Sequence, residues 1–295
     1  MGKVFDGDGK ITLMKLTTRD HDRESAGLSY VYPVLSRRSG GLSIGINLNP
    51  NNACNWRCIY CQVPDLRRGT APDIDLIRLR SELTRFLQDA SGADFYTRFQ
   101  IPPGQRTIRD IAISGNGEPT SARAFPEVIG VIREVAASLG LLGTIKLVLI
   151  TNGSLMGRAA VQRGIVQWAE LGGEIWFKVD SATRAGLSRT NGVSLSPLSV
   201  ARNLKIAGRL CPTWVQTCLF AFDGQPPAED DLRAYLDFLS ERVREGLPLR
   251  GVLLYGLARP SLQPEAARLT ALSPAWMESF ADRIRSVGLP VKLSL

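Results

Sequence analysis

The sequence predicts a mixed α/β fold, a partial (β/α)6 TIM barrel with parallel strands, preceded by an N-terminal arm. Short apolar runs alternate six times with segments of helical periodicity, and glycine marks the end of several helical segments. The 295 residues, 44% of them hydrophobic, are enough to bury a substantial core. Regular β–α alternation favours a parallel sheet with crossover helices, because each strand then enters the sheet in the same direction.

The six expected strands are short, nearly continuous apolar runs, as in parallel strands that are buried on both faces. They span residues 43–50, 109–117, 145–153, 174–180, 213–222 and 250–258. The expected helices that follow them span residues 75–90, 125–140, 158–172, 199–210, 229–246 and 274–288. In the first of these helices Ile77, Leu79, Leu83 and Leu87 have helical spacing and predict the buried face.

Two segments interrupt this alternation. Residues 1–42 are expected to form an arm that ends in a Gly-Gly turn, so that residues 43–295 make up the barrel. Residues 91–107 contain two prolines and three aromatic residues without periodicity, which predicts a loop or flap. No clean boundary divides the chain, and we expect one domain overall.

Composition restricts the functional class. The sequence has no run of eighteen apolar residues and its N-terminus lacks the apolar core of a signal peptide, which predicts a cytoplasmic protein without a membrane partner. An odd number of cysteines, five, fits a disulfide framework poorly and a metal or redox site well. The net charge of +8 makes RNA a plausible partner, although the positive residues are scattered; no DNA partner is expected.

Cys54, Cys58 and Cys61 form a C-x3-C-x2-C array directly after the first expected strand. Thiolates are soft ligands for zinc, copper(I) and iron–sulfur clusters. Three ligands on a four-iron cluster would leave one iron open. The alternatives are three buried thiols or a zinc site completed by Cys211 or His21, as in a non-catalytic zinc or RNA-binding module.

The other cysteines lie far from this array in the sequence. Cys211 and Cys218 could bind a second cluster, but their spacing is unusual for iron–sulfur ligation, and Cys218 lies in an apolar run that predicts a core position. His21, beside Asp22 in the arm, is expected at the surface or in a flap that meets substrate.

Polar residues recur where the expected strands end. The second strand ends in the residues Gly115, Asn116, Gly117, Glu118 and Pro119. Asn152 ends the third strand, and Lys178 and Asp180 end the fourth. A lysine seldom lies unpaired in a buried strand, so Lys178 and Asp180 predict either a functional pair or a structural ion pair. Lys178 is also a candidate catalytic residue, as a Schiff base with a carbonyl substrate.

CNWRCIYC at residues 54–61 resembles the cluster motif of radical S-adenosylmethionine (radical SAM) enzymes. This resemblance implies a [4Fe–4S] cluster on Cys54, Cys58 and Cys61 whose fourth iron binds the cofactor S-adenosylmethionine. It also implies reductive cleavage of this cofactor to a 5′-deoxyadenosyl radical, which abstracts hydrogen from a substrate. An external electron donor of the flavodoxin or ferredoxin type would supply the electron.

The same resemblance assigns the cofactor-binding residues. Tyr60 occupies the aromatic position near adenine, and GNGEP at residues 115–119 resembles the element that receives the methionine amino group, with Glu118 beside the ammonium. Asn152, Lys178 and Asp180 match positions that contact ribose and carboxylate. On the sixth strand, Tyr255 and Gly256 match the segment beside adenine, although Tyr255 is equally compatible with core packing.

The barrel region, residues 43–258, is most similar in appearance to bacterial relatives of the tRNA 4-demethylwyosine synthases. That similarity implies a tRNA base as substrate. Those enzymes use a second cysteine-bound cluster in the N-terminal region, and here no cysteine precedes Cys54. A peptide or a small metabolite is therefore the alternative substrate.

Overall fold

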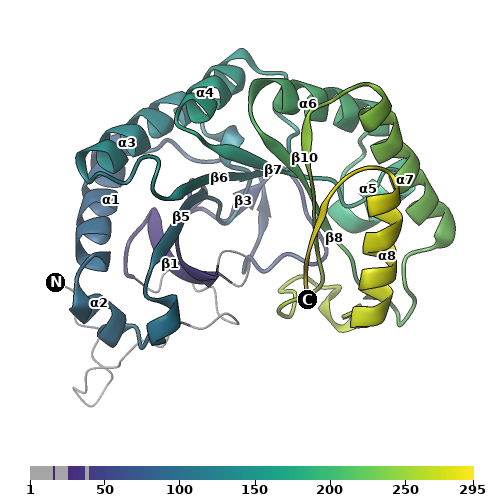
Figure 1. Ribbon diagram of the computed structural model, residues 1–295, viewed down its shortest axis with the longest axis horizontal. Coiled ribbons are helices and arrows are strands. Elements are labelled where there is room, and N and C mark those ends of the chain that lie inside the picture. Colours follow the sequence, from purple (N-terminus) through teal and green to yellow (C-terminus); the bar gives the residue numbers. More distant parts are fainter. Residues whose placement is uncertain (1–15, 17–25, 37–39) are drawn as a thin grey trace.

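A computed structural model describes residue 16, residues 26–36 and residues 40–295. Its main sheet curls into a half barrel, with helices on the outside (Figure 1). The strands, in spatial order, are β1 (Val31–Ser36), β2 (Gly41–Ile46), β5 (Ile108–Ile113), β6 (Lys146–Thr151), β7 (Glu174–Lys178), β8 (Thr213–Cys218), β10 (Leu249–Tyr255) and β12 (Val291–Ser294). All neighbours pair in parallel except β1 and β2. The predicted partial TIM barrel is confirmed.

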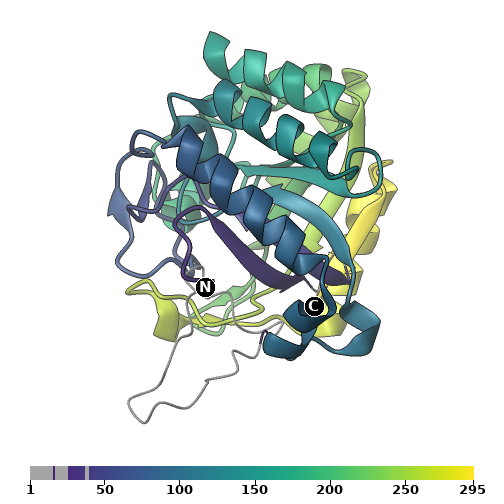
Figure 2. The same cartoon turned by 90° about the vertical axis from the view of Figure 1, so that its left-hand side faces the viewer.

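All six expected helices form. They are α1 (Leu76–Ala90), α3 (Phe125–Ser138), α4 (Ala159–Glu170), α6 (Pro197–Leu210), α7 (Glu229–Arg244) and α8 (Pro274–Ser286). Two of them begin with a recognisable capping pattern. Ser196 caps α6 and Ser273 caps α8 through their side chains, and a proline occupies the first position of each helix. Turned by 90°, Figure 2 shows α1, α3 and α4 as one layer against the outer face of the sheet.

Shorter elements connect these layers. They are α2 (Ala93–Arg98), α5 (Arg184–Asn191), η1 (Pro103–Gln105), η2 (Pro119–Ser121), η3 (Ala266–Arg268), and the two-residue strands β3 (Ala53–Cys54), β4 (Arg67–Arg68), β9 (Ala221–Phe222) and β11 (Leu269–Thr270). β3 pairs with β4, and β9 pairs with β11. No helix in the described part of the chain is long and apolar enough to cross a membrane.

The core lies between the sheet and the helical layer. Leu79, Leu83 and Leu87 of α1 are fully buried, and burying each such side chain stabilises the fold by about 2 kcal/mol. Ile77, which the periodicity placed on the same face, is instead 84% exposed. It is the second residue of α1, two positions before Leu79, and so points to a different side of the helix.

Two expectations about the irregular segments are corrected. The region expected to be an arm contributes β1, which closes one edge of the sheet antiparallel to β2. Residues 91–107 are not a flap, because they form α2 and η1, and the buried Phe95 of α2 packs edge-on against Phe86 of α1. No residue of 91–107 lines the cavity described below. His21 lies outside the described residues.

Candidate functional site

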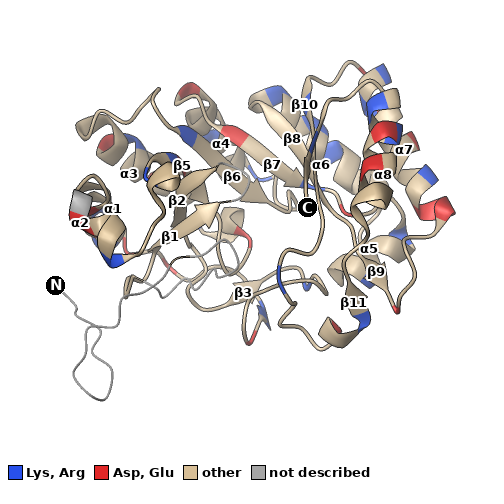
Figure 3. Cartoon of the chain, turned by 60° about the horizontal axis from the view of Figure 1, so that its bottom comes forward, with Lys and Arg blue, Asp and Glu red and all other residues tan. Residues whose placement is uncertain are grey.

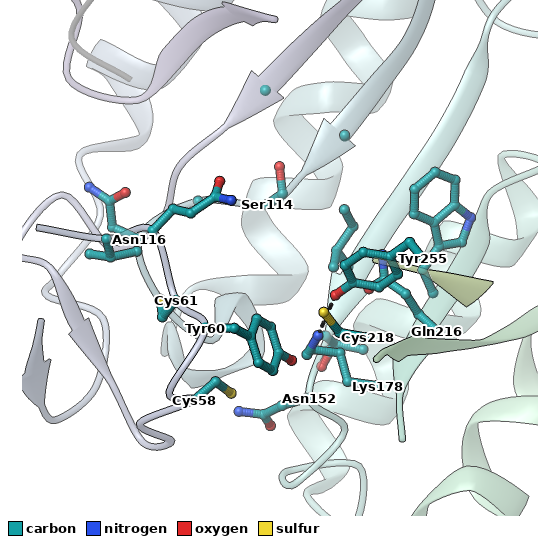
Figure 4. A pocket seen from close by; sticks show the side chains of 18 of the residues that line it. Cys58, Tyr60, Cys61, Ser114, Asn116, Asn152, Lys178, Gln216, Cys218 and Tyr255 are labelled. Atoms are coloured by element: carbon teal, nitrogen blue, oxygen red, sulfur yellow. Dashed lines mark hydrogen bonds between the residues drawn. The ribbon is translucent and has the colours of Figure 1, made fainter. Parts of the chain in front are cut away.

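A cavity of about 310 Å³ lies inside the half barrel and reaches the carboxyl ends of the parallel strands (Figure 4). This is the position at which parallel α/β folds bind ligands. Most of the residues predicted to form the site line it. They are Cys54, Cys58, Tyr60, Cys61, Gly115, Asn116, Gly117, Glu118, Asn152, Lys178, Tyr255 and Gly256. Pro119 and Asp180 do not line it.

The loop that carries the three cysteines is fixed at three points. β3 pairs with β4, and Gly69 N donates to Cys54 O at 3.1 Å. The end of α5 binds the middle of the loop through two backbone hydrogen bonds. The carbonyl of Asn191 accepts from Arg57 N, and the carbonyl of Thr190 accepts from Ile59 N. The loop after β10 fixes the last cysteine, because Leu262 N donates to Cys61 O at 2.9 Å.

Two hydrogen-bond donors point at cysteine sulfurs. Trp56 N donates to Cys54 Sγ at 3.4 Å, and Asn191 Nδ2 donates to Cys58 Sγ at 3.2 Å. Burial raises the pKa of the Cys54 and Cys58 thiols to about 12. A nearby cation is therefore needed to hold these sulfurs as thiolates at neutral pH.

The donor chemistry of the loop fits an iron–sulfur cluster. Three thiols on one short loop face the same cavity, and none forms a disulfide. Hydrogen bonds from N–H groups to the sulfurs are one of the factors that set the reduction potential of such clusters. Among the described residues, no group of three or more His, Cys, Asp or Glu side chains is arranged to hold a metal ion.

Glu118 joins the GNGEP turn to β6. Its Oε1 accepts from Thr120 Oγ1 and Thr151 Oγ1, both at 2.6 Å, and from Thr120 N, while Oε2 accepts from Asn152 N at 2.6 Å. Burial raises the pKa of Glu118, and these hydrogen bonds oppose that rise. Its carboxylate therefore positions the ends of two strands, in addition to the predicted contact with an ammonium group.

The glycines of this turn are required by close backbone approach. A Cβ on Gly115 would lie 2.3 Å from Asn47 Oδ1, and one on Gly117 would lie 2.1 Å from Ala53 O. Asn47 Oδ1 also accepts from Asn116 N at 3.0 Å. The turn is thus packed against the segment that leads into the cysteine loop, and Asn116 is compatible with this packing.

Lys178 lies at the centre of the charged part of the cavity. Its Nζ donates to Tyr255 Oη at 2.9 Å, lies 3.7 Å from Asp180 Oδ2, and lies 4.9 Å from the centre of the Tyr60 ring. Burial alone would lower the pKa of this ammonium, but the Asp180 carboxylate outweighs burial and the pKa lies above its usual value. The Asp180 carboxylate therefore favours the charged form of Lys178, and the Schiff-base role of this lysine stays a prediction.

Asp180 lies behind this cation. Its side chain is fully buried and accepts from Tyr60 Oη at 2.5 Å, from Asn191 Nδ2 at 2.7 Å and from Cys218 N at 2.9 Å. The geometry therefore does not support the predicted contact between Asp180 and a ligand in the cavity. The carboxylate instead positions Tyr60 and Lys178, which do face the cavity.

The remaining cysteines do not form a second cluster. Cys211 caps the end of α6 and donates to Gly173 O before the start of β7, whereas Cys218 ends β8. Seven residues of extended chain separate them by roughly 20 Å. Cys211 does not line the cavity and so does not complete a metal site there, whereas Cys218 is buried, as expected, and also faces the cavity.

The sequence interpretation missed two residues of the site. Asn191 lies at the end of α5, a polar helix without apolar periodicity that was not expected. Gln216 is 2% exposed, lines the cavity, and its Oε1 has no hydrogen-bond partner among the described residues. The alternation of β8 could have identified Gln216, because it shares a face with Cys218 and pairs in register with Lys178.

The fold is that of radical SAM enzymes. A structure of TYW1 with a lysine-pyruvate adduct bound superposes with a TM-score of 0.52 at 13% identity, over 90% of this chain and 78% of that one. A radical SAM methyltransferase from Sphaerobacter thermophilus superposes with a TM-score of 0.52 at 14% identity, over 86% of this chain and 66% of that one.

Sequence similarity is more limited. A UPF0026 protein of Helicobacter pylori is 28% identical over 137 residues, which is 46% of this chain. The match spans 38% of that relative, well under two thirds of its length. No protein-family model matches the chain.

Proposed function

We propose that this protein is a radical SAM enzyme that holds a [4Fe–4S] cluster on Cys54, Cys58 and Cys61. One observation carries the proposal: these thiols share a cavity with polar residues from the carboxyl ends of several parallel strands, among them Asn152 and Lys178. The fold adds support, because the similar solved structures include radical SAM enzymes.

The bound cluster and S-adenosylmethionine would supply reductive cleavage of the cofactor and hydrogen abstraction from the substrate. The residues of this chain would bind and orient the cluster and the cofactor. The N–H groups of Trp56 and Asn191 stabilise charge on the cysteine sulfurs. Lys178 offers a fixed cation to the cofactor carboxylate, and Glu118 holds Asn152 at the cavity wall. Tyr60, tied to Asp180, provides an aromatic face for adenine and excludes water.

Anaerobic reconstitution with iron and sulfide tests the assignment. We expect a brown protein with about four irons per chain, and 5′-deoxyadenosine after addition of dithionite and S-adenosylmethionine. The Cys54→Ala variant should lose both. Cys211→Ala is the matched control, because its sulfur lies outside the cavity. If Cys54→Ala kept the cluster and cleavage, or if zinc replaced iron in the purified protein, the proposal would be wrong.

For the substrate, we infer a tRNA base. The charge of +8 and the sequence resemblance to tRNA-modifying enzymes support this class, and a reducing cytoplasm is the compartment that fits both RNA and an unprotected cluster. Binding to total tRNA should fall steeply with salt if phosphates are contacted. Salt-independent or absent binding would favour the peptide or small-metabolite alternative.

A further inference from the structure

The cavity extends from the predicted cofactor residues toward the amino ends of the strands. Every second residue of β1 and of the segment 110–114 lines it: Tyr32, Val34, Ser36, Asp110, Ala112 and Ser114. Because alternate residues of a strand share one face, these strands turn their whole inner face to the cavity. In a closed barrel, side chains fill this space in layers. Here it forms part of the cavity, deeper in the half barrel than the residues predicted to bind the cofactor.

β7 and β8 form one wall of this inner space. Trp176 and Lys178 line the cavity from β7, and Gln216 lines it from β8. Gln216 pairs in register with Lys178. Trp176 pairs two residues closer to the amino end, with Trp214. Trp176 and Gln216 are therefore diagonal neighbours on one face of the sheet, close enough to contact one ligand. Figure 4 shows Gln216 beside Tyr255, on the same side of the cavity as Lys178.

A carboxylate orients the Trp176 indole. Its Nε1 donates to Glu174 Oε1 at 2.8 Å, and Glu174 Oε2 accepts from Trp214 Nε1 at 3.2 Å. Trp214 does not line the cavity, and its ring packs against Gly251, where a Cβ would lie 2.9 Å from Cζ3 of the indole. Trp176 is thus the one of these two indoles that a ligand can reach. Since its single N–H is already used, Trp176 offers a ligand its flat apolar ring.

Gln216 contributes a hydrogen-bond acceptor to the same wall. Its side chain is 2% exposed, and its Oε1 has no hydrogen-bond partner among the described residues. The neighbouring Lys178 cation donates instead to Tyr255 Oη at 2.9 Å. β8 has the sequence TWVQTC, which contains no charged residue, so Figure 3 draws this strand in tan. A neutral ligand with an N–H group would satisfy the acceptor, because buried polar groups are normally hydrogen-bonded.

We propose that Trp176 and Gln216 form the substrate subsite of this enzyme, and that they hold a planar nitrogen heterocycle that carries an N–H donor. This inference rests on the proposed function and specifies the group that the site recognises. The Trp176 ring stacks on the heterocycle, and Gln216 Oε1 accepts from its N–H. A sugar has donors but no flat face, and a phosphate is an anionic acceptor, so both fit this wall poorly.

The test is anaerobic titration calorimetry of the reconstituted holoenzyme. Saturating S-adenosylmethionine is present throughout, so that the predicted adenine position beside Tyr60 is already filled. The probes are inosine, which has a ring N–H and a carbonyl, purine riboside, which has the same ring without them, and ribose. The variants are Trp176→Leu, Trp176→Phe, Gln216→Leu and the control Trp214→Leu. The control removes the other indole from the same carboxylate, and that indole does not line the cavity.

We expect inosine to bind wild type about fivefold more tightly than purine riboside, because one hydrogen bond distinguishes them, and ribose not to bind. Trp176→Leu should weaken the binding of both nucleosides about tenfold. Trp176→Phe keeps an aromatic face and should stay within about threefold of wild type. In Gln216→Leu the preference for inosine over purine riboside should disappear. Trp214→Leu should bind both nucleosides as wild type does.

Absence of inosine binding to the wild-type holoenzyme would overturn the proposal. Equal losses in Trp176→Leu and Trp214→Leu would also overturn it, because the indole would then act only on the fold, as would an unchanged preference for inosine in Gln216→Leu. Iron content and dithionite-dependent formation of 5′-deoxyadenosine are measured on the same wild-type sample. A sample that has the cluster and cleaves the cofactor but does not bind inosine contradicts the subsite alone, whereas a sample without a cluster contradicts the proposed function.

Discussion

The two ends of the half barrel differ in how completely their polar groups are hydrogen-bonded. At the amino end, the Glu174 carboxylate accepts from the indole N–H groups of Trp176 at 2.8 Å and Trp214 at 3.2 Å. Lys292 Nζ lies 4.1 Å from the Trp214 ring, which adds a cation–π contact. The donors and acceptors of this carboxylate–indole cluster therefore satisfy one another.

At the carboxyl end one polar group is incompletely satisfied, and several others face a cavity. Gln216 Oε1 has no partner in the described part of the chain, and the thiols of Cys54, Cys58, Cys61 and Cys218 face one cavity, as does the paired Lys178 cation. An unpaired buried polar group costs about 1–3 kcal/mol unless something binds it. Trp176 of the amino-end cluster also lines this cavity. The contrast indicates that the amino end mainly stabilises the fold, whereas the carboxyl end presents groups that can bind a ligand.

The largest expected effect separates two glutamates, the buried Glu118 at the carboxyl end and the partly buried Glu174 at the amino end. Glu118→Ala removes the acceptor of four hydrogen bonds at the carboxyl end, so we expect about 3 kcal/mol loss of stability and at least tenfold weaker binding of S-adenosylmethionine. Glu174→Ala removes the acceptor that two indole N–H groups share and should cost about 2 kcal/mol, with cofactor affinity unchanged.

Urea unfolding and calorimetric titration of the reconstituted protein measure the two quantities. The control is Glu127→Ala, which changes a carboxylate in the first turn of α3 and should affect neither by more than about 0.5 kcal/mol. Equal loss of cofactor affinity in Glu118→Ala and Glu174→Ala would show that the two ends are not functionally distinct.

The contrast between the ends explains what the sequence could predict. Parallel strands bring their carboxyl ends to one edge, so polar residues at the ends of different strands, such as Asn152 and Lys178, predict a shared site without knowledge of long-range contacts. The same logic predicted the six repeating strands and helices. Asp180, two residues after the end of β7, does not line the cavity, so its predicted contact with the cofactor stays a prediction.

Features that depend on distant partners could not be predicted. The edge strand β1 contains Pro33, which weakens a strand signal, and β12 has four residues, too few to show alternation. α5 is polar and is held by a Thr183 cap and a left-handed Gly192, so its sequence reads as a loop. The contact that gives it importance, Asn191 with Cys58, joins residues 133 positions apart.

A smaller effect is expected from Asn191→Leu, which removes one donor from Cys58 Sγ and one from Asp180. Stability should fall by about 2 kcal/mol, because a buried carboxylate loses a hydrogen bond. The cluster should still assemble, but its reduction potential should become more negative, since N–H groups near cluster sulfurs favour the reduced, more negatively charged state.

Asn203→Leu is the matched control. Asn203 is also a buried asparagine, on α6, and its Nδ2 donates to Gly153 O at 2.9 Å, but it contacts no cysteine. The Asn203→Leu variant should lose a comparable amount of stability in thermal unfolding. The reduction potential of its cluster, measured by spectroelectrochemical titration, should not change. An unchanged potential in Asn191→Leu would mean that the contact with Cys58 is structural and does not tune a cluster.

The smallest effect on stability, and the sharpest on function, is expected from Gln216→Leu. The buried amide oxygen of Gln216 has no partner among the residues that the structure describes, so an apolar side chain of similar size should leave stability unchanged or raise it by about 1 kcal/mol. Gln167 on α4 also has a buried, unpartnered Oε1, but it lies outside the cavity. Gln167→Leu should therefore shift thermal stability in the same direction.

The two variants should differ in turnover. If Gln216 binds the substrate, its loss should lower formation of modified product at least tenfold, while uncoupled cleavage of S-adenosylmethionine stays within about twofold of wild type. Mass spectrometry of total tRNA nucleosides and small metabolites from expressing cells measures the first, and 5′-deoxyadenosine the second. Wild-type product formation by Gln216→Leu would contradict this prediction. It would show that the unpaired amide oxygen of Gln216, like that of Gln167 on α4, has no role in substrate binding.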